Sequence, residues 1–275
     1  MSKRTQRRAR RGAYATTRRT FLATARLGFL PLFLLCVPAA SVAGAPTTEV
    51  VVIGTVHSPT AHYRSDTLVR ILDRAKPDLI LFEVDTSFID GSAKLKPQYR
   101  AMNLEAIAVA GTDAPLAPYD INGRNEFYQR TRFFERMQEL SQALSGLARE
   151  RRLVPEARAL LDSITAYDRV RDAFLVDRAE VINTAACDSA MARKQAYAIS
   201  GMKRIVELTP ELRPFADFTT LRAEEWDRRH RAMIENIANQ VRTHAGKRIV
   251  VLCGFEHRYA LRGALAGRPG ITLRE

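Results

Sequence analysis

Three short apolar runs constrain the fold of this chain more than any other feature. They read EVVVI at residues 49–53, DLILFEV at 78–84 and RIVVLC at 248–253. Near-continuous runs of Val, Ile and Leu are typical of parallel strands that helices cover on both faces. A weaker strand, PLAPYDI around Tyr119, contains two prolines. Proline cannot donate to a strand ladder, so this segment suits only a sheet edge or the start of a strand.

Helical patterns separate these strands. Between the first two, SDTLVRILDRAKPD places Leu68, Ile71 and Leu72 on one helical face, with Ser65 as the expected N-cap. This predicts a strand–helix–strand unit with a right-handed crossover. The stretch from about residue 125 to 206 reads as helical throughout and is too long for a connector. We therefore predict an α/β fold: a mostly parallel sheet with flanking helices and a long helical insertion between strands.

A further helix is predicted over LRAEEWDRRHRAMIENIANQVRTHAG, directly before the last strong strand. Its apolar residues recur at helical spacing and predict a stripe that packs on the core. The members of this stripe are Trp226, Met233, Ile237 and Val241. A short helix from Tyr259 and a final strand, ITLR, are expected after the last strong strand.

The first 43 residues have the order of an export signal. These residues include nine Lys or Arg and no acidic residue. An apolar stretch from Leu27 to Val37, too short to span a bilayer, is followed by small residues that end at Ala43. The segment RRTFL at 18–22 resembles a twin-arginine signal. The alternatives are an ordinary secretory signal or an uncleaved membrane anchor. We predict a signal over 1–43, a single α/β domain over 44–275 with its insertion at about 125–206, and export to a bacterial periplasm without a stable transmembrane span after cleavage.

The charge of the chain is concentrated in that signal. Of the formal net charge of +13, nine positive charges lie in residues 1–43, which leaves about +4 for the rest. No aromatic-basic pattern typical of nucleic-acid binding is present, so we predict no nucleic-acid partner. Two cysteines, Cys187 and Cys253, remain beyond the signal. They make no disulfide scaffold, and the spacings for zinc sites and haem attachment are absent.

The motif Gly-x-x-His occurs twice, each time after a strong strand. GTVH ends at His57, and GFEH ends at His257. The second strand ends with Glu83, and the weak strand is followed by Asp120. Because ligands bind beyond the carboxyl ends of parallel strands, these side chains are expected to meet at one edge of the sheet. Two imidazoles and two carboxylates suit a divalent metal (Mn, Fe, Co or Zn) or general acid–base chemistry.

The motif glycines, Gly54 and Gly254, permit a tight turn and a close approach of the backbone. Glu83 lies in an apolar run, where a carboxylate must be either paired or functional. Asp120 fits a site residue and an Asx turn in DING equally well. Arg229 on the late helix suits an oxyanion partner, with an ordinary surface arginine as the alternative. We interpret the remaining candidates as structural residues. Asp85 is expected in a turn, His62 in a loop, His244 as a cation at a helix end, and Cys253 as a small buried residue.

These motifs resemble the superfamily that contains TraB, TIKI and erythromycin-esterase proteins, together with haem-binding bacterial lipoproteins. The resemblance lies in GTVH, PDLILFEVD, WDRRHRAMIENI and GKRIVVLCGFEHRYALRGAL, at both ends of the region after the signal. It implies an α/β fold whose site contains His57, Glu83 and His257, and more weakly Arg229. Members include metal-dependent peptidases, esterases that activate water with His and Glu, and haem binders, so the resemblance does not settle the reaction.

Three functions follow as hypotheses. The first is an exported hydrolase that cleaves a peptide or ester bond of a small-molecule or peptide substrate. His57 or Glu83 would be its base, alone or on a metal, with His257 as second ligand or acid and Asp120 as a further metal ligand. The second is a haem or metal binder without turnover, in which the two imidazoles are axial ligands. The third is a periplasmic interaction protein with a relic site. Substrate and oligomeric state stay open.

Overall fold

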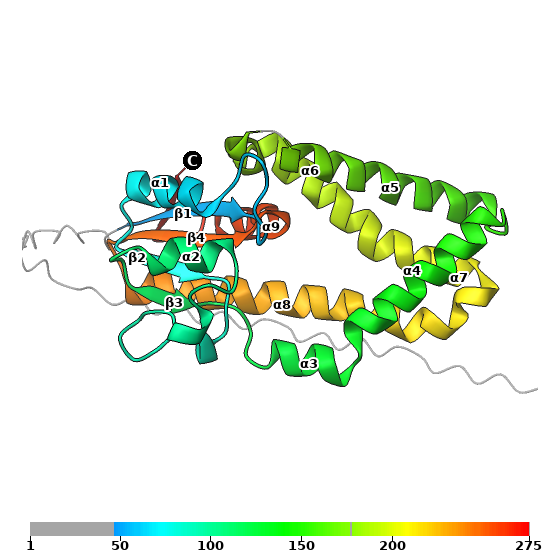
Figure 1. The fold of residues 1–275 in the computed structure, drawn as a ribbon, viewed down its shortest axis with the longest axis horizontal. Helices are drawn as coiled ribbons and strands as arrows, with labels where there is room; N and C mark the ends of the chain where they lie inside the picture. Colours follow the sequence, from blue (N-terminus) through cyan, green and yellow to red (C-terminus); the bar gives the residue numbers. More distant parts are fainter. Residues whose placement is uncertain (1–46, 177, 275) are drawn as a thin grey trace, which may run out of the picture. The chain divides into compact units, whose positions relative to one another are not determined.

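The computed structural model describes residues 47–176 and 178–274, and the predictions made for residues 1–43 lie outside them. The described chain contains a five-stranded, wholly parallel sheet in the order β3-β2-β4-β1-β5, with helices on both faces (Figure 1). The strands are β1 (Thr48–Thr55), β2 (Leu79–Phe82), β3 (Leu116–Pro118), β4 (Arg248–Gly254) and β5 (Ile271–Arg274). The predicted α/β fold is confirmed.

The α-helices are α1 (Ser65–Ala75), α2 (Leu104–Ala110), α3 (Arg124–Arg130), α4 (Phe133–Arg149), α5 (Pro155–Val176), α6 (Ala185–Ala196), α7 (Met202–Leu208), α8 (Ala216–Thr243) and α9 (Phe255–Leu265). Short 3₁₀ turns cover Thr86–Phe88, Pro97–Tyr99, Ala179–Asn183 and Pro210–Phe215, and a π-helical turn covers Tyr197–Gly201. The helices from α3 to α8 lie between β3 and β4, so the predicted long helical insertion is confirmed as well.

The order of the strands differs from the simplest expectation in one way. β4, from the end of the chain, pairs with both β1 and β2, so the first two strands of the predicted strand–helix–strand unit do not pair with each other. In this register Thr55 of β1 lies beside Gly254 of β4. The two Gly-x-x-His motifs therefore start from neighbouring strands. β3 lies at one edge of the sheet, as its prolines predict.

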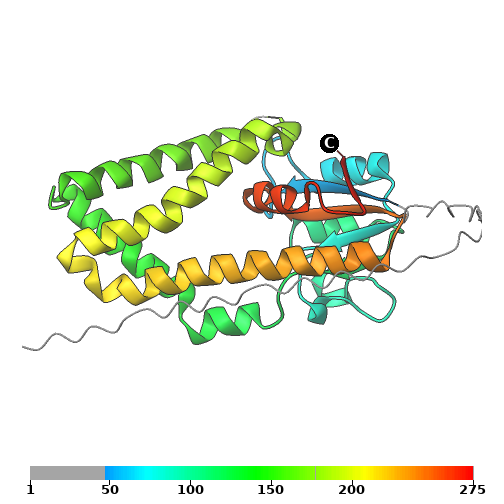
Figure 2. The ribbon, with the colours of Figure 1, turned by 180° about the vertical axis from the view of Figure 1, so that it is seen from behind.

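Helices bury both faces of the sheet. On one face, Leu68 and Leu72 of α1 belong to a core cluster that includes Ile80 and Val250 of the sheet. On the opposite face, α8 and α9 pack on alternate residues of the same strands (Figure 2). The α8 residues buried there are Met233, Ile237 and Val241. The buried strand runs follow from this double cover, because neither face offers a place for polar side chains.

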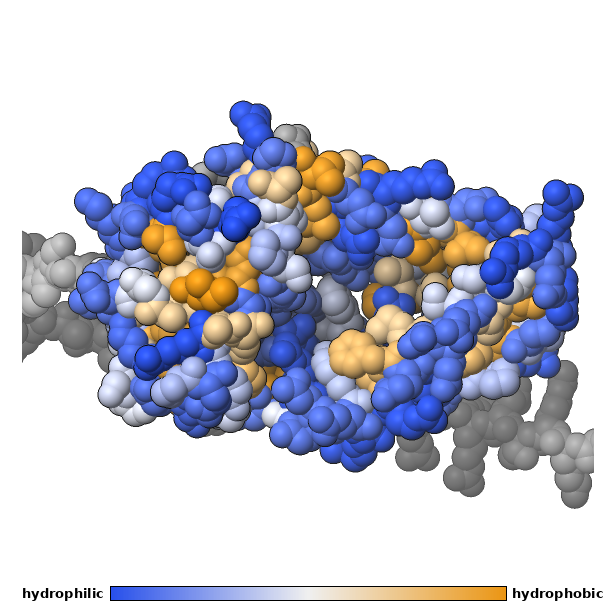
Figure 3. Space-filling view, in the orientation of Figure 1, coloured by the Kyte–Doolittle hydropathy of each residue, from blue (hydrophilic) through white to orange (hydrophobic). Residues whose placement is uncertain are grey.

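The helical insertion has a core of its own, built from α4, α5, α7 and the start of α8. Helix α8 joins the two cores, because Phe218 near its start packs in the insertion and Met233 packs on the sheet. Figure 3 shows a hollow between the sheet and the insertion, with apolar residues on its insertion side. No helix in the described residues combines the length and the apolarity that a bilayer span requires.

Three local expectations were wrong. Ser65 is the first residue of α1 and not its cap, since Arg64 occupies the cap position without a side-chain hydrogen bond. Helix α9 begins at Phe255, directly after β4, and not at Tyr259, because Gly254 already turns the chain into the helix. Trp226 is only half-buried and does not belong to the core stripe of α8, because its ring stacks on the imidazole of His257.

Candidate functional site

Polar side chains from four neighbouring strands meet at the carboxyl edge of the sheet. His57 follows β1, Glu83 follows β2 and Asp120 follows β3. His257 lies in the first turn of α9, directly after β4, and Arg229 reaches the same place from α8. The structure therefore brings together all five residues singled out in the sequence.

Arg229 forms the centre of a buried ionic cluster. Its Nε and Nη2 donate to the two oxygens of Asp120 at 2.9 and 2.8 Å, and Nη2 also donates to Glu83 Oε1 at 2.5 Å. Arg124 donates to Asp120 Oδ2 at 2.5 Å. Both carboxylate side chains and the Arg229 side chain are less than one-tenth exposed. Two guanidinium groups thus balance two carboxylates, which is how a protein tolerates charges in its interior.

Both carboxylate oxygens of Glu83 are hydrogen-bonded, one within this cluster and one at the start of α9. Its Oε2 accepts a hydrogen bond of 2.7 Å from the backbone N–H of Gly254. Burial raises its pKa, but His257, Arg229 and the Gly254 N–H lower it more, and the result is a pKa of about 2. A carboxylate with this pKa holds its negative charge at neutral pH and is a weak proton acceptor. Glu83 is therefore suited to anchor Arg229 and α9 rather than to act as a base.

A chain of hydrogen bonds fixes the tautomers of two histidines. His230 Nδ1 lies 2.9 Å from the Trp226 carbonyl oxygen, which can only accept, so His230 carries its proton there. His230 Nε2 then accepts from His257 Nδ1 at 3.0 Å. His257 Nε2 in turn accepts from Arg229 Nη1 at 3.2 Å. Neutral imidazoles satisfy every link.

The pKa directions agree with neutral rings. Burial is the largest effect on His257 and lowers its pKa, Glu83 raises it, Arg229 and His230 lower it, and the result is a pKa of about 4. Burial also lowers the pKa of His230. The ring of Trp226 stacks on His257 with centroids 4.9 Å apart. His257 is thus an uncharged acceptor that holds Arg229.

His57 has a different environment, which depends on a residue that the sequence analysis missed. Its Nδ1 donates to Glu105 Oε1 at 2.8 Å, and Thr55 Oγ1 donates to the same oxygen at 2.7 Å. The N–H of Leu104 donates to the His57 carbonyl oxygen at 3.2 Å, which ties the start of α2 to the His57 backbone. The hydrogen bond to Glu105 raises the pKa of His57 against the opposing effect of burial. The Nε2 atom has no hydrogen-bond partner in the described part of the chain.

Glu105 carried a signal in the sequence that was overlooked. It is a carboxylate within the apolar run LEAIAVA, and in the structure it is 2% exposed. Its Oε2 is buried without a hydrogen-bond partner among residues 47–176 and 178–274. Burying a carboxylate in an apolar helix is costly, and the hydrogen bonds from Thr55 and His57 offset that cost and fix the orientation of the His57 ring. The role of His230 was also missed and Trp226 was assigned to the core stripe, because both rings contact His257 on a different helix, α9.

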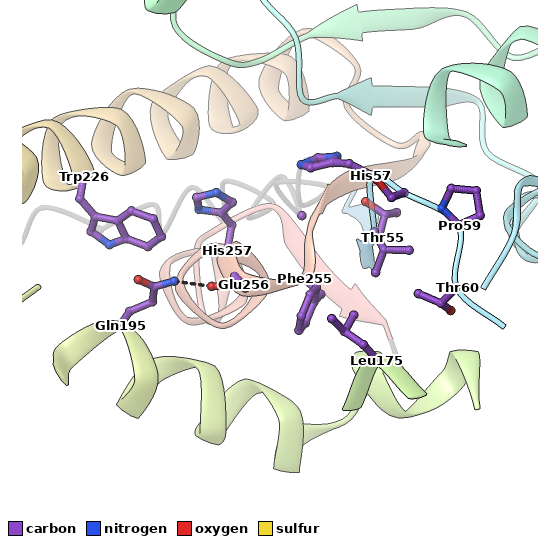
Figure 4. Close-up of a pocket in the computed structure, with 13 residues that line it drawn as sticks. Thr55, His57, Pro59, Thr60, Leu175, Gln195, Trp226, Phe255, Glu256 and His257 are labelled. Carbon is purple, nitrogen blue, oxygen red and sulfur yellow. Dashed lines mark hydrogen bonds between the residues drawn. The ribbon is translucent and has the colours of Figure 1, made fainter. Parts of the chain in front are cut away.

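A pocket of about 440 Å³ opens between His57, His257 and the helical insertion (Figure 4). Apolar and aromatic side chains form much of its wall, and the insertion contributes Leu175 and Gln195. A Cβ atom placed on Gly254 would lie 3.5 Å from His257 Cδ2, 3.6 Å from His57 Nε2 and 3.9 Å from Glu83 Oε2. The two imidazoles and the glutamate thus converge around Gly254 beside the pocket.

The donor atoms do not fit a divalent metal. Both oxygens of Glu83 and both ring nitrogens of His257 already hold hydrogen bonds. The guanidinium of Arg229 supplies the positive charge that a metal ion would bring. Within the described residues, no group of three His, Cys, Asp or Glu side chains is arranged to hold a metal ion. Haem held by two axial imidazoles would need a free ring nitrogen on both His57 and His257. Among the described residues, His57 has one, whereas both ring nitrogens of His257 are hydrogen-bonded.

The other candidates have structural surroundings. Asp85 accepts from the N–H of Ser87 as the cap of a short 3₁₀ turn. The thiol of Cys253 is fully buried, and burial raises its pKa well above the usual range, which is unfavourable for a nucleophile. His244 caps the end of α8 through the carbonyl of Gln240.

Fold and site together define a parallel α/β domain with a histidine–glutamate pair beside a buried ionic cluster. Comparison of the chain with protein-family models, curated proteins and solved structures gave no match. The resemblance to the TraB, TIKI and erythromycin-esterase superfamily therefore rests on the motifs themselves.

Proposed function

We propose that this protein is a hydrolase that activates water with His57 and cleaves an ester or peptide bond of a substrate held in the 440 Å³ pocket. The observation that carries the proposal is the His57–Glu105 pair. Glu105 holds the Nδ1 proton, so the neutral ring has its lone pair on Nε2, which lies beside the pocket and has no hydrogen-bond partner among residues 47–176 and 178–274. A carboxylate-oriented imidazole with this geometry is the usual general base for hydrolysis near neutral pH.

The reaction follows from these positions. His57 Nε2 takes a proton from a water molecule as the water oxygen bonds to the carbonyl carbon of the substrate. The tetrahedral intermediate then collapses, the bond to the leaving oxygen or nitrogen breaks, and His57 returns its proton to that leaving atom. The negative charge on the carbonyl oxygen requires N–H donors. The first turn of α9 borders the pocket, and the leading amides of a helix have no partners within it.

Arg229 and His257 receive supporting roles. Four of the five N–H groups of Arg229 are used by Asp120, Glu83 and His257, so its function is to hold the edge of the sheet together. No step requires a metal ion or haem. Export to the periplasm belongs to the same proposal and rests on the pattern of residues 1–43.

The test compares His57→Gln and Glu105→Gln with the parent protein on a panel of chromogenic esters and peptides. We expect His57→Gln to lose turnover by about 10²- to 10⁴-fold with the fold intact by circular dichroism. Glu105→Gln should lower the pKa of His57, measured by NMR titration, and move the acid limb of the pH–rate profile to lower pH. His62→Gln, in the exposed loop after His57, is the matched control. Full turnover of His57→Gln on a cleaved substrate would refute the proposal.

A further inference from the structure

A second pocket also has His57 in its wall. Its volume is about 280 Å³, and it shares residues 57–59 with the larger pocket. Arg64, Asn103 and Ile107 form part of its remaining wall. His57, whose side chain is exposed, is thus shared by two pockets, so a substrate cleaved there can place one part in each pocket.

The two pockets differ in chemistry. The larger one is lined by apolar and aromatic side chains, among them Leu175, Trp226 and Phe255. Its single carboxylate, Glu256, is engaged by Lys194 Nζ at 2.6 Å and by Gln195 Nε2 at 2.7 Å. The larger pocket therefore offers an apolar surface without a free charge, which favours an uncharged aromatic or aliphatic group.

The smaller pocket offers a cation. Arg64 is the only Arg or Lys in its wall, no Asp or Glu lines it, and Arg64 makes no ion pair in the described part of the chain. The nearby Asp66 is paired with Arg70 at 2.9 Å. Ile107 and Met102 are exposed and line the same pocket as Arg64, so their hydrocarbon can cover a short methylene chain.

We infer that the substrate carries a carboxylate on the Arg64 side and an apolar group on the Trp226 side of the bond that His57 hydrolyses. The inference rests on the proposed function for the cleavage step. A carboxylate suits the single guanidinium, because it carries one negative charge at neutral pH whereas a phosphate monoester carries ~1.5–2. Arg64 would thereby select substrates and set their orientation without taking part in the bond changes.

The test uses two esters of equal length, 4-nitrophenyl hexanoate and the mono-4-nitrophenyl ester of adipic acid. They differ only in the end of the acyl chain, which is a methyl group or a carboxylate. We expect the parent protein to have the higher kcat/KM for the adipic ester, and Arg64→Gln to lower this preference about two- to fivefold, as befits an exposed ion pair. Raising the salt concentration should reduce the preference of the parent protein as well. Arg74→Gln, on the exposed surface of α1 and outside the pocket, should leave the preference unchanged.

A binding measurement separates this inference from the proposed reaction. The anilides of the same two acids are titrated by calorimetry into His57→Gln, which lacks the proposed base, with and without Arg64→Gln. Tighter binding of the adipic anilide that Arg64→Gln abolishes supports the inference even if neither ester is hydrolysed. Equal binding of the two anilides, or no binding of either, overturns it, as does an ester preference that survives in Arg64→Gln. Hydrolysis that persists in His57→Gln contradicts only the proposed function.

Discussion

Replacing His257 with Gln tests the chain of neutral histidines through the pH dependence of stability. In the unfolded chain an imidazole takes up a proton near pH 6.5, whereas in the fold His257 does so only near pH 4. Between these values the unfolded state binds more protons, so acidification favours unfolding. With about 1.36 kcal/mol for each pKa unit, His257 contributes a loss of about 2 kcal/mol to the free energy of unfolding between pH 7 and pH 5.

The Gln side chain keeps an acceptor for Arg229 but has no group that titrates in this range. We therefore expect the free energy of unfolding to decrease between pH 7 and pH 5 by about 2 kcal/mol less in His257→Gln than in the parent protein. The readout is the change in unfolding free energy with pH, and not the absolute stability, because Gln also loses the stacking on Trp226.

Urea unfolding at pH 7, 6 and 5 measures the effect. Trp226 is the only tryptophan of the chain and stacks on His257, so its fluorescence reports both unfolding and protonation of that ring. His62→Gln removes an exposed imidazole and should retain the pH dependence of the parent protein. If the parent protein and His257→Gln lose equal stability between pH 7 and pH 5, then His257 is not held neutral by burial and the proposed chain is wrong.

Two further perturbations test the cluster and the motif glycines. Arg229→Gln removes the guanidinium that pairs with Glu83 and one of the two that pair with Asp120. We therefore expect the free energy of unfolding, measured in urea at pH 7, to fall by about 3–5 kcal/mol. A decrease below 1 kcal/mol would contradict the central role of this guanidinium. Gly54→Ala should lower the free energy of unfolding by about 1–3 kcal/mol in the same assay, because a Cβ atom there would lie 3.0 Å from a carbon of α9. In Gly254→Ala the added Cβ meets no atom closer than 3.5 Å. This variant should therefore fold with little loss of stability, while the space between the two imidazoles becomes narrower. Equal destabilisation by the two alanines would refute this distinction.

Most of the sheet could be predicted from the sequence because its signals are local. Runs of Val, Ile and Leu mark buried parallel strands, and prolines mark β3 as an edge strand. The order of the strands could not be predicted, since the place of β4 between β1 and β2 depends on pairing between segments almost 200 residues apart.

The roles of the site residues were less predictable than their identities. The sequence indicated His57, Glu83, Asp120 and His257 because each follows a strand, and parallel strands end at one edge. It could not indicate that Glu83 and His257 would be engaged by Arg229, since that depends on which face of α8 packs on the sheet.

Glu105 illustrates the same limit. Its sequence context shows a carboxylate among apolar residues, but only the packing of α2 against the end of β1 places it 2.8 Å from His57. By itself the sequence determined which residues are apolar enough to form the sheet and which polar residues stand at its edge. The tertiary structure decided which of them hold their charge, which stay neutral and which keep a free lone pair, because hydrogen-bond partners and burial come from distant parts of the chain.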